Sequence, residues 1–241
     1  MMGWPPVFLF DLDGTLVHFS AEYSRRYAQI IRQTFNLFSI TPDEALIKRI
    51  ELFGDFDAVT KLIGDERVDY FWFKVEQADF QLRKHLMGCG EITLIPGATD
   101  VLQAIREIMP PERLPSLVSN TNPASAFWQM WHFGILSSFQ HVYLLNWNFR
   151  TPKPDPEGFL ACLGEYGPIG QVPVVYVGDV ASDVEMVERA KKIYPELRTY
   201  TILLDLQKGA SERVIGADHV IGNLNALPDL AREMMSTKEF P

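Results

Sequence analysis

Short apolar runs alternate with longer segments of mixed apolar and polar residues along most of the chain. The apolar runs end in polar or glycine-containing turns and lie at residues 7–10, 115–118, 141–145, 172–177, 199–204 and 218–221. Continuous apolar runs of this length are typical of buried strands in a parallel sheet. Helix-length segments lie between or after them, at residues 98–108, 123–133, 156–166, 182–192 and 225–235. This alternation predicts an α/β fold built on a doubly wound, Rossmann-like parallel sheet.

The stretch from about residue 18 to residue 91 does not follow this alternation. It holds several helical patterns with no convincing strand between them. The segment Thr41-Pro42-Asp43-Glu44 indicates the start of one helix, with a cap residue, a proline at the first position and acid in the first turn. We therefore expect residues 18–91 to form a helical bundle inserted into a core. The consecutive aromatic residues 70–73 are expected to lie in the hydrophobic interior of that bundle.

Composition narrows the class of protein. The 241 residues are 47% apolar and 22% charged, as in ordinary globular proteins. The net charge of −9 disfavours nucleic acid and membrane surfaces as partners, because both carry negative charge themselves. The two cysteines lie far apart, and we see neither a signal peptide nor an apolar run long enough to span a membrane. These features lead us to expect a cytoplasmic protein.

Two of the predicted strands end in paired carboxylates. Asp11 and Asp13 follow the first strand, and Asp179 and Asp183 follow the fourth. Ligands of open α/β sheets bind beyond the carboxyl ends of the strands, and Mg²⁺ is usually held by one or two carboxylates together with a substrate phosphate. The alternative is structural: aspartates at such places also satisfy turn amides or stabilise the N-terminus of a helix.

Two further strand ends carry groups that suit an anion. Ser119 and Asn120 follow the second strand, and such side chains can bind phosphate oxygens or cap a helix. Lys153 lies between Pro152 and Pro154, whose locked φ angles fix the direction of the lysine side chain, although most lysines in such turns are solvated. Each signal alone is ambiguous. Together they predict that acids, a hydroxyl and a lysine meet at one edge of the sheet.

These four segments resemble the motifs of the haloacid dehalogenase-like superfamily, in particular its phosphatase branch, which includes phosphoglycolate phosphatase-like proteins. The motifs are Asp11-Leu12-Asp13-Gly14-Thr15, Ser119-Asn120, Lys153-Pro154, and Gly178-Asp179 with Asp183. The resemblance covers essentially the whole chain. It implies a Rossmann-like catalytic core of residues 1–17 and 92–241, and an α-helical cap domain of residues 18–91 that selects the substrate.

The resemblance also implies roles for the two aspartates of the first motif. Asp11 is expected to be the nucleophile and to form an aspartyl-phosphate. Asp13 is expected to protonate the leaving oxygen and then to take a proton from the hydrolytic water. Family members that cleave carbon–halogen or phosphonate bonds lack an acid at the position of Asp13, so the resemblance favours phosphate esters.

The remaining motif residues are implied to hold a metal ion and the phosphoryl group. Mg²⁺ is expected on Asp11, the backbone carbonyl of Asp13 and Asp179, with Asp183 as a further ligand or an indirect partner. The phosphoryl oxygens are expected to contact Ser119, Asn120 and Lys153. Arg150, just before the lysine turn, is a candidate substrate-binding residue at the mouth of the site.

The expected activity is Mg²⁺-dependent hydrolysis of a small phosphorylated metabolite, such as phosphoglycolate or a sugar phosphate, by a monomer or a homodimer. Two alternatives stay open. A sugar phosphomutase would carry the same motifs. A catalytically silent member would act through a partner protein, but it should show a defective motif, and all four motifs of this sequence are intact.

Overall fold

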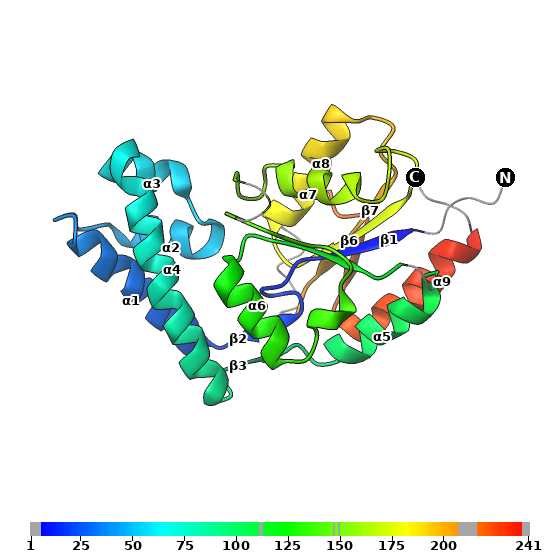
Figure 1. The fold of residues 1–241 in the computed structure, drawn as a ribbon, viewed down its shortest axis with the longest axis horizontal. Coiled ribbons are helices and arrows are strands. Elements are labelled where there is room, and N and C mark those ends of the chain that lie inside the picture. The colour runs from blue at the N-terminus through cyan, green and yellow to red at the C-terminus, as the bar shows by residue number, and fades with distance from the viewer. Residues whose placement is uncertain (1–5, 111–112, 147, 149, 207–215, 238–241) are drawn as a thin grey trace. The chain divides into compact units, whose positions relative to one another are not determined.

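The computed structural model describes residues 6–110, 113–146, 148, 150–206 and 216–237 (Figure 1). The chain divides into two compact units, which we call the sheet unit (Met1–His18 with Leu94–Pro241) and the helical unit (Phe19–Thr93). Of the helices in the described ranges, none combines the length and the apolar character needed to cross a membrane.

The sheet unit contains a parallel sheet, which has six strands within the described residues. The strands are β1 (Val7–Phe10), β4 (Ser116–Ser119), β5 (Val142–Leu144), β6 (Val174–Gly178), β7 (Thr199–Leu204) and β8 (His219–Ile221), in the order β5-β4-β1-β6-β7-β8. β1 lies in the middle, where Phe10 pairs with Leu117 of β4 and with Val177 of β6. The chain reverses its winding direction at β1, and ligands of open α/β sheets bind at such a reversal.

Helices cover both faces of this sheet. They are α5 (Ala98–Ile108), α6 (Pro123–His132), α7 (Glu157–Gly164), α8 (Ala181–Ile193) and α9 (Leu227–Thr237). Figure 1 shows α7 and α8 on one face and α5 and α9 on the other. The predicted doubly wound α/β sheet is confirmed, and the bounds of its strands and helices lie within two residues of those expected.

Burial on both faces explains the apolar runs in the sequence. All four residues of β1 are inaccessible to solvent. A strand that is covered on both faces has no polar side, so its sequence is continuously apolar rather than alternating. None of the described strands of this sheet contains Asp, Glu, Lys or Arg, and the charged residues of the motifs come after the strands, at the carboxyl edge of the sheet.

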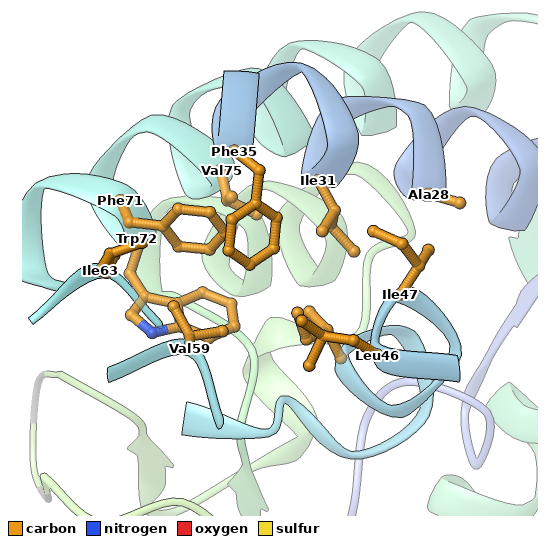
Figure 2. Close-up of a cluster of buried hydrophobic side chains, with 11 residues drawn as sticks. Ala28, Ile31, Phe35, Leu46, Ile47, Val59, Ile63, Phe71, Trp72 and Val75 are labelled. Atoms are coloured by element: carbon orange, nitrogen blue, oxygen red, sulfur yellow. The ribbon is translucent and has the colours of Figure 1, made fainter. Parts of the chain in front are cut away.

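The helical unit packs four helices around its own hydrophobic cluster. The helices are α1 (Ala21–Asn36), α2 (Glu44–Phe53), α3 (Phe56–Ile63) and α4 (Asp65–Gly88). Figure 2 shows Ile31 and Phe35 of α1 against Phe71 and Val75 of α4. The ring centroids of Phe35 and Phe71 are 4.6 Å apart, a separation typical of interacting aromatic side chains.

The expectation that residues 70–73 all lie in this interior is wrong for two of them. Phe71 and Trp72 are buried, whereas Tyr70 and Phe73 are 52% and 56% exposed. A helix turns by about 100° per residue because it has 3.6 residues per turn. Four consecutive side chains therefore cannot share one buried face.

The predicted start of α2 is also wrong, by two residues. Thr41 and Pro42 precede the helix, which begins at Glu44 with Asp43 as its N-cap. The carboxylate of Asp43 accepts a hydrogen bond of 2.7 Å from the backbone N–H of Leu46. A cap on this third amide satisfies a donor that has no partner inside the helix, and this interaction fixes the start.

The chain passes between the two units through two short strands that the sequence pattern did not predict. β2 (Val17–Phe19) and β3 (Ile92–Leu94) pair with each other in a two-stranded sheet. Three residues are too few to show a period in a sequence, so such strands are recognised only from their pairing.

Candidate active site

The loop after β1 brings the first motif to the carboxyl edge of the sheet. The backbone N–H of Asp11 donates to the carbonyl oxygen of Val177 at 2.9 Å, which continues the pairing of β1 with β6. Gly14 has a φ of 85°, and a Cβ atom at this position would lie 2.1 Å from a carboxylate oxygen of Asp179. Glycine therefore supplies both the left-handed turn and the space in which the β1 and β6 loops meet.

Lys153 lies at the centre of a buried polar cluster. Its Nζ atom is 2.6 Å from Oδ1 of Asp11, 2.9 Å from Oδ1 of Asp183 and 2.8 Å from the hydroxyl of Tyr176. The Lys153 side chain is 4% exposed, so these contacts are made away from water. Three hydrogen-bond acceptors match the three N–H groups of the ammonium.

Asn120 supports the backbone of the lysine loop. Its Oδ1 atom accepts a hydrogen bond of 2.9 Å from the backbone N–H of Lys153. The second motif therefore orients the third motif directly.

Asp183 uses both of its carboxylate oxygens within the protein. Oδ1 accepts hydrogen bonds from Lys153 and from the Tyr176 hydroxyl, each at 2.9 Å. Oδ2 accepts from the backbone N–H groups of Asp179 and Val180 at 3.2 and 3.3 Å. These contacts tie the first turn of α8 to the lysine.

Three carboxylates come together in a way that could hold a cation. Asp11, Asp179 and Asp183 each offer one oxygen atom within 4.8 Å of the other two. The Thr15 hydroxyl donates to Oδ1 of Asp179 at 3.1 Å and helps to fix the position of that carboxylate. Hard oxygen donors of this kind are the ligands that Mg²⁺ prefers, so the residues present fit this ion.

The electrostatics of the cluster also suit a cation. Burial raises the pKa of Asp11 from 3.8 to about 7, although Lys153 lowers it, and Asp183 raises it further. Burial, followed by Asp183 and Asp11, raises the pKa of Asp179 well above its usual value. Burial alone would lower the pKa of Lys153, but Asp11 and Asp183 outweigh this effect and raise it. One lysine thus faces three acids, and a divalent cation would compensate the excess negative charge.

Asp13 points to a different set of partners. Oδ2 accepts a hydrogen bond of 2.9 Å from the hydroxyl of Thr121, and Oδ1 accepts one of 3.3 Å from the Nε2 amide group of Gln129. Ser119 is adjacent, with Oγ 3.0 Å from Oγ1 of Thr121. The side chains of the first and second motifs are therefore joined through Thr121.

Seven of the eight site residues predicted from the sequence belong either to the contacts around Lys153 or to those around Asp13. They are Asp11, Asp13, Ser119, Asn120, Lys153, Asp179 and Asp183. Arg150 is exposed, and its backbone N–H donates to Glu157 at 3.0 Å. Within the described residues it does not join the buried cluster, so the structure gives no support to its placement at the mouth of the site.

Sequence reasoning missed three residues that contact the motif side chains, namely Thr121, Gln129 and Tyr176. Thr121 stands directly beside a motif, and this position was the available signal. Gln129 is a fully buried amide on α6, and Tyr176 carries a hydroxyl in a strand otherwise made of valine and glycine. Their partners become evident only when the chain is folded.

Solved structures of several other proteins share this fold. A protein from Lactobacillus plantarum, provisionally named a phosphoglycolate phosphatase, is 17% identical with a TM-score of 0.67, and the match covers 95% of this chain and 100% of that one. β-Phosphoglucomutase from Clostridium difficile is 15% identical with a TM-score of 0.70, covering 96% and 97%. CbbY from Rhodobacter sphaeroides, solved in complex with phosphate, is 17% identical with a TM-score of 0.65, covering 92% and 95%.

Sequence comparison identifies the family. None of the curated proteins compared with this chain matches it significantly. The sequence model described as haloacid dehalogenase-like hydrolase, however, matches residues 5–191, which span all four motifs and most of the chain. The resemblance inferred from the motifs is thereby confirmed, and the chain belongs to the haloacid dehalogenase-like hydrolase family.

Proposed function

We propose that this protein is a Mg²⁺-dependent phosphatase that hydrolyses a small phosphate monoester through an aspartyl-phosphate intermediate. One observation carries the proposal, the convergence of four charged residues at the carboxyl edge of the sheet: Asp11, Lys153, Asp179 and Asp183. Nζ of Lys153 lies 2.6 Å from Oδ1 of Asp11, and both side chains are buried. Family membership and likeness of fold support it.

In the first step, a carboxylate oxygen of Asp11 attacks the phosphorus atom of the monoester. A bond forms between Asp11 and phosphorus while the bond from phosphorus to the leaving oxygen breaks. Asp13 donates a proton to that oxygen, so the alcohol leaves in its neutral form.

In the second step, water attacks the phosphorus atom of the aspartyl-phosphate. Asp13, now ionised, accepts a proton from this water, and the bond between Asp11 and phosphorus breaks. Inorganic phosphate forms, and Asp11 and Asp13 return to their initial states.

The other motif residues hold the phosphoryl group. Lys153 and Ser119 would donate hydrogen bonds to its oxygens, and preorganised donors of this kind are typically worth about a hundred- to a thousand-fold in rate. Asp183 and Tyr176 hold the lysine ammonium, and Asn120 holds its backbone.

Asp11, Asp179 and the backbone carbonyl of Asp13 would hold Mg²⁺. When bound, this ion supplies positive charge beside the phosphoryl group and lowers the cost of bringing an anion to the acidic cluster. Asp183, whose two oxygens already accept hydrogen bonds, would orient Asp179 and Lys153 rather than bind the ion.

We also propose that the helical unit is a cap domain that selects the substrate. The support is its insertion between β1 and the rest of the sheet unit and its separate hydrophobic interior. In enzymes with caps, closure excludes water and contacts the leaving group.

The test is a panel of phosphate monoesters with Mg²⁺, including phosphoglycolate and several sugar phosphates. We expect phosphate release from at least one of them, and loss of that release in the Asp11→Asn variant. Asp100→Asn, the same change at an exposed position on α5, is the matched control and should retain full activity. Equal activity of wild type and Asp11→Asn would disprove the proposal.

Likeness of fold to a β-phosphoglucomutase makes a phosphomutase the second candidate. Product analysis separates the two activities. A phosphatase releases inorganic phosphate, whereas a mutase returns a phosphorylated isomer and is activated by a bisphosphorylated sugar. Formation of the isomer without phosphate release would favour the mutase.

A further inference from the structure

The carboxylate of Asp13 is held on both of its oxygen atoms by neutral side chains. Thr121, just beyond β4, contacts Oδ2 at 2.9 Å, and Gln129, two turns into α6, contacts Oδ1 at 3.3 Å. Two contacts from separate elements fix both the position of the carboxylate and its rotation about the last bond of the side chain. A single contact would fix only the position.

The contacts around Thr121 have defined hydrogen-bond directions. The single hydroxyl hydrogen of Thr121 points to Oδ2 of Asp13, which accepts it. Oγ1 of Thr121 is then the acceptor of the 3.0 Å contact with Ser119, and the Ser119 hydroxyl is the donor. Oγ of Ser119 in turn accepts from the backbone N–H of Thr121 at 3.3 Å.

The two side chains that hold Asp13 are themselves immobilised. Gln129 is completely buried, and Thr121 is 7% exposed. A buried amide that lost its partner would leave polar groups unsatisfied, which disfavours rotation of Gln129 away from Asp13. Burial at this depth also shows that neither residue is a surface polar group that meets Asp13 by chance.

We propose that Thr121 and Gln129 are positioning residues, which hold the Asp13 carboxyl group in line with the oxygen that leaves the substrate. The inference rests on the proposed function, because it assigns a role within the first step of hydrolysis. In that step the proton moves from Asp13 to the leaving oxygen as the bond from phosphorus to that oxygen breaks. Thr121 and Gln129 neither gain nor lose a proton.

A comparison of two leaving groups isolates this role. An alkyl phosphate expels a strongly basic oxygen and needs the proton, whereas p-nitrophenyl phosphate expels a weakly basic oxygen and does not. The quantity to measure is kcat/KM with Mg²⁺, because it reports the steps up to release of the alcohol and excludes the later hydrolysis of the aspartyl-phosphate. A substrate from the monoester panel serves as the alkyl phosphate.

For Thr121→Val, which keeps the shape but removes the hydroxyl, we expect kcat/KM for the alkyl phosphate to fall by roughly 10- to 100-fold. For p-nitrophenyl phosphate it should change by less than about threefold. Gln129→Met, which keeps the length but removes the amide, should show the same selectivity for the alkyl substrate. Thr121→Ser restores the hydroxyl and should return the alkyl activity to near the wild-type value.

Asp13→Asn and Asp11→Asn make the outcomes separable. Asp13→Asn should show the largest selective decrease in kcat/KM for the alkyl phosphate. Asp11→Asn should abolish activity toward both substrates. If Asp11→Asn is as active as wild type, the proposed function fails. Suppose that Asp11→Asn is inactive, but that Thr121→Val and Gln129→Met lower kcat/KM equally for both substrates or for neither. Only the positioning role is then overturned. Thermal melting of each variant excludes misfolding, and Thr121→Ala replaces Thr121→Val if the latter does not fold.

Discussion

Asp11 occupies a place that penalises its own negative charge. Burial raises the pKa of Asp11 to about 7, despite the opposing effect of Lys153 at 2.6 Å. Such a penalty is common in sites that bind a cation, because the bound ion offsets the free-energy cost of the buried negative charge. The acidic cluster of the metal-free protein is therefore a source of instability that ligand binding would relieve.

This penalty predicts how the stability of the metal-free protein depends on pH. The pKa of Asp11 is about 7 in the folded state and near 3.8 when the chain is unfolded. Between these values the folded state binds more protons, so the free energy of unfolding falls as the pH rises, by at most about 1.4 kcal/mol per pH unit from this group. In Asp11→Asn the decline from pH 4 to 7 should be less steep. Denaturant titrations with a chelator measure it.

The matched control for this pH dependence is Asp100→Asn, an exposed position on α5. A pH dependence of stability that is identical in wild type and Asp11→Asn would show that the buried carboxyl group does not retain its proton.

Removal of the Lys153 ammonium should destabilise the protein, because it leaves buried acidic groups without a cationic partner. In Lys153→Met, Asp11 and Asp183 keep their burial but lose their cationic partner. Breaking a buried pair by removing one partner typically costs about 3–5 kcal/mol. We expect a decrease of that order in the free energy of unfolding of the metal-free protein, measured by denaturant titration near pH 8.

Lys191→Met provides the comparison for the lysine change. Lys191 is paired with Glu188 on α8, and its side chain is 31% exposed. A pair of this kind contributes about 0–1 kcal/mol. Similar losses for Lys153→Met and Lys191→Met would contradict the assignment of Lys153 as the electrostatic centre of the site.

The sequence indicated the charged members of the site and two neutral motif residues, Ser119 and Asn120, but not the other neutral members. Asp11, Asp13, Asp179 and Asp183 follow strand ends, and this place in the pattern is readable without a structure. Thr121, Gln129 and Tyr176 are types of residue that occur throughout ordinary interiors, and only their distances to Asp13 and Lys153 set them apart. Partners of neutral polar groups depend on packing, which a linear pattern does not contain.

At the scale of elements, the site depends on two loops that approach each other closely. The β1 loop and the β6 loop meet at Gly14, where any side chain would overlap the Asp179 carboxylate. A second close approach lies at Gly178, where a Cβ atom would be 2.4 Å from the carboxylate of Asp183. Glycine at these positions is therefore a requirement of loop packing.

Gly14→Ala should displace Asp179 and destroy the geometry of the acidic cluster. We expect a loss of activity of at least about a hundred-fold, with a cost in stability of about 1–3 kcal/mol from the left-handed backbone. Gly134→Ala is the matched control, because its φ is also positive, at 70°, and nothing lies within 4 Å of the added Cβ atom. Kinetic assays with thermal melts distinguish the effects. Equal losses of activity in the two variants would attribute the result to backbone strain alone.

Elements were predictable where the pattern was long and uniform. The strand and helix bounds of the sheet unit agree within two residues because buried strands have unbroken apolar runs and Asn122 with Pro123 marks the start of α6. The pattern failed at β2 and β3, which are too short to show a period, and at the start of α2, where Asp43 is the cap instead of Thr41. Which of two neighbouring residues caps a helix depends on the backbone conformation of the folded chain.

At the scale of the whole molecule, the net charge of −9 opposes an anionic substrate. The three clustered carboxylates outnumber the one lysine, so the site itself also carries excess negative charge that repels an anion. If Mg²⁺ supplies the missing positive charge, inorganic phosphate should bind roughly tenfold or more weakly after chelation of metal. Calorimetric titration of phosphate, with Mg²⁺ and with chelator, measures this difference. Equal affinity in both conditions would contradict the dependence on a cation.

The central position of β1 has a consequence for how the chain is made. Val7 pairs with Val174, so β1 lacks its β6 neighbour until most of the sequence has left the ribosome. At about 5–20 residues per second, synthesis of the intervening segment takes roughly 10 to 30 s. During this time the helical unit, whose contacts are local, can form, while an unbroken apolar strand waits with an open edge. Among the described strands of this sheet that have two neighbours, β1 thus waits longest for the second one, and its apolar edge stays open to other chains during that time.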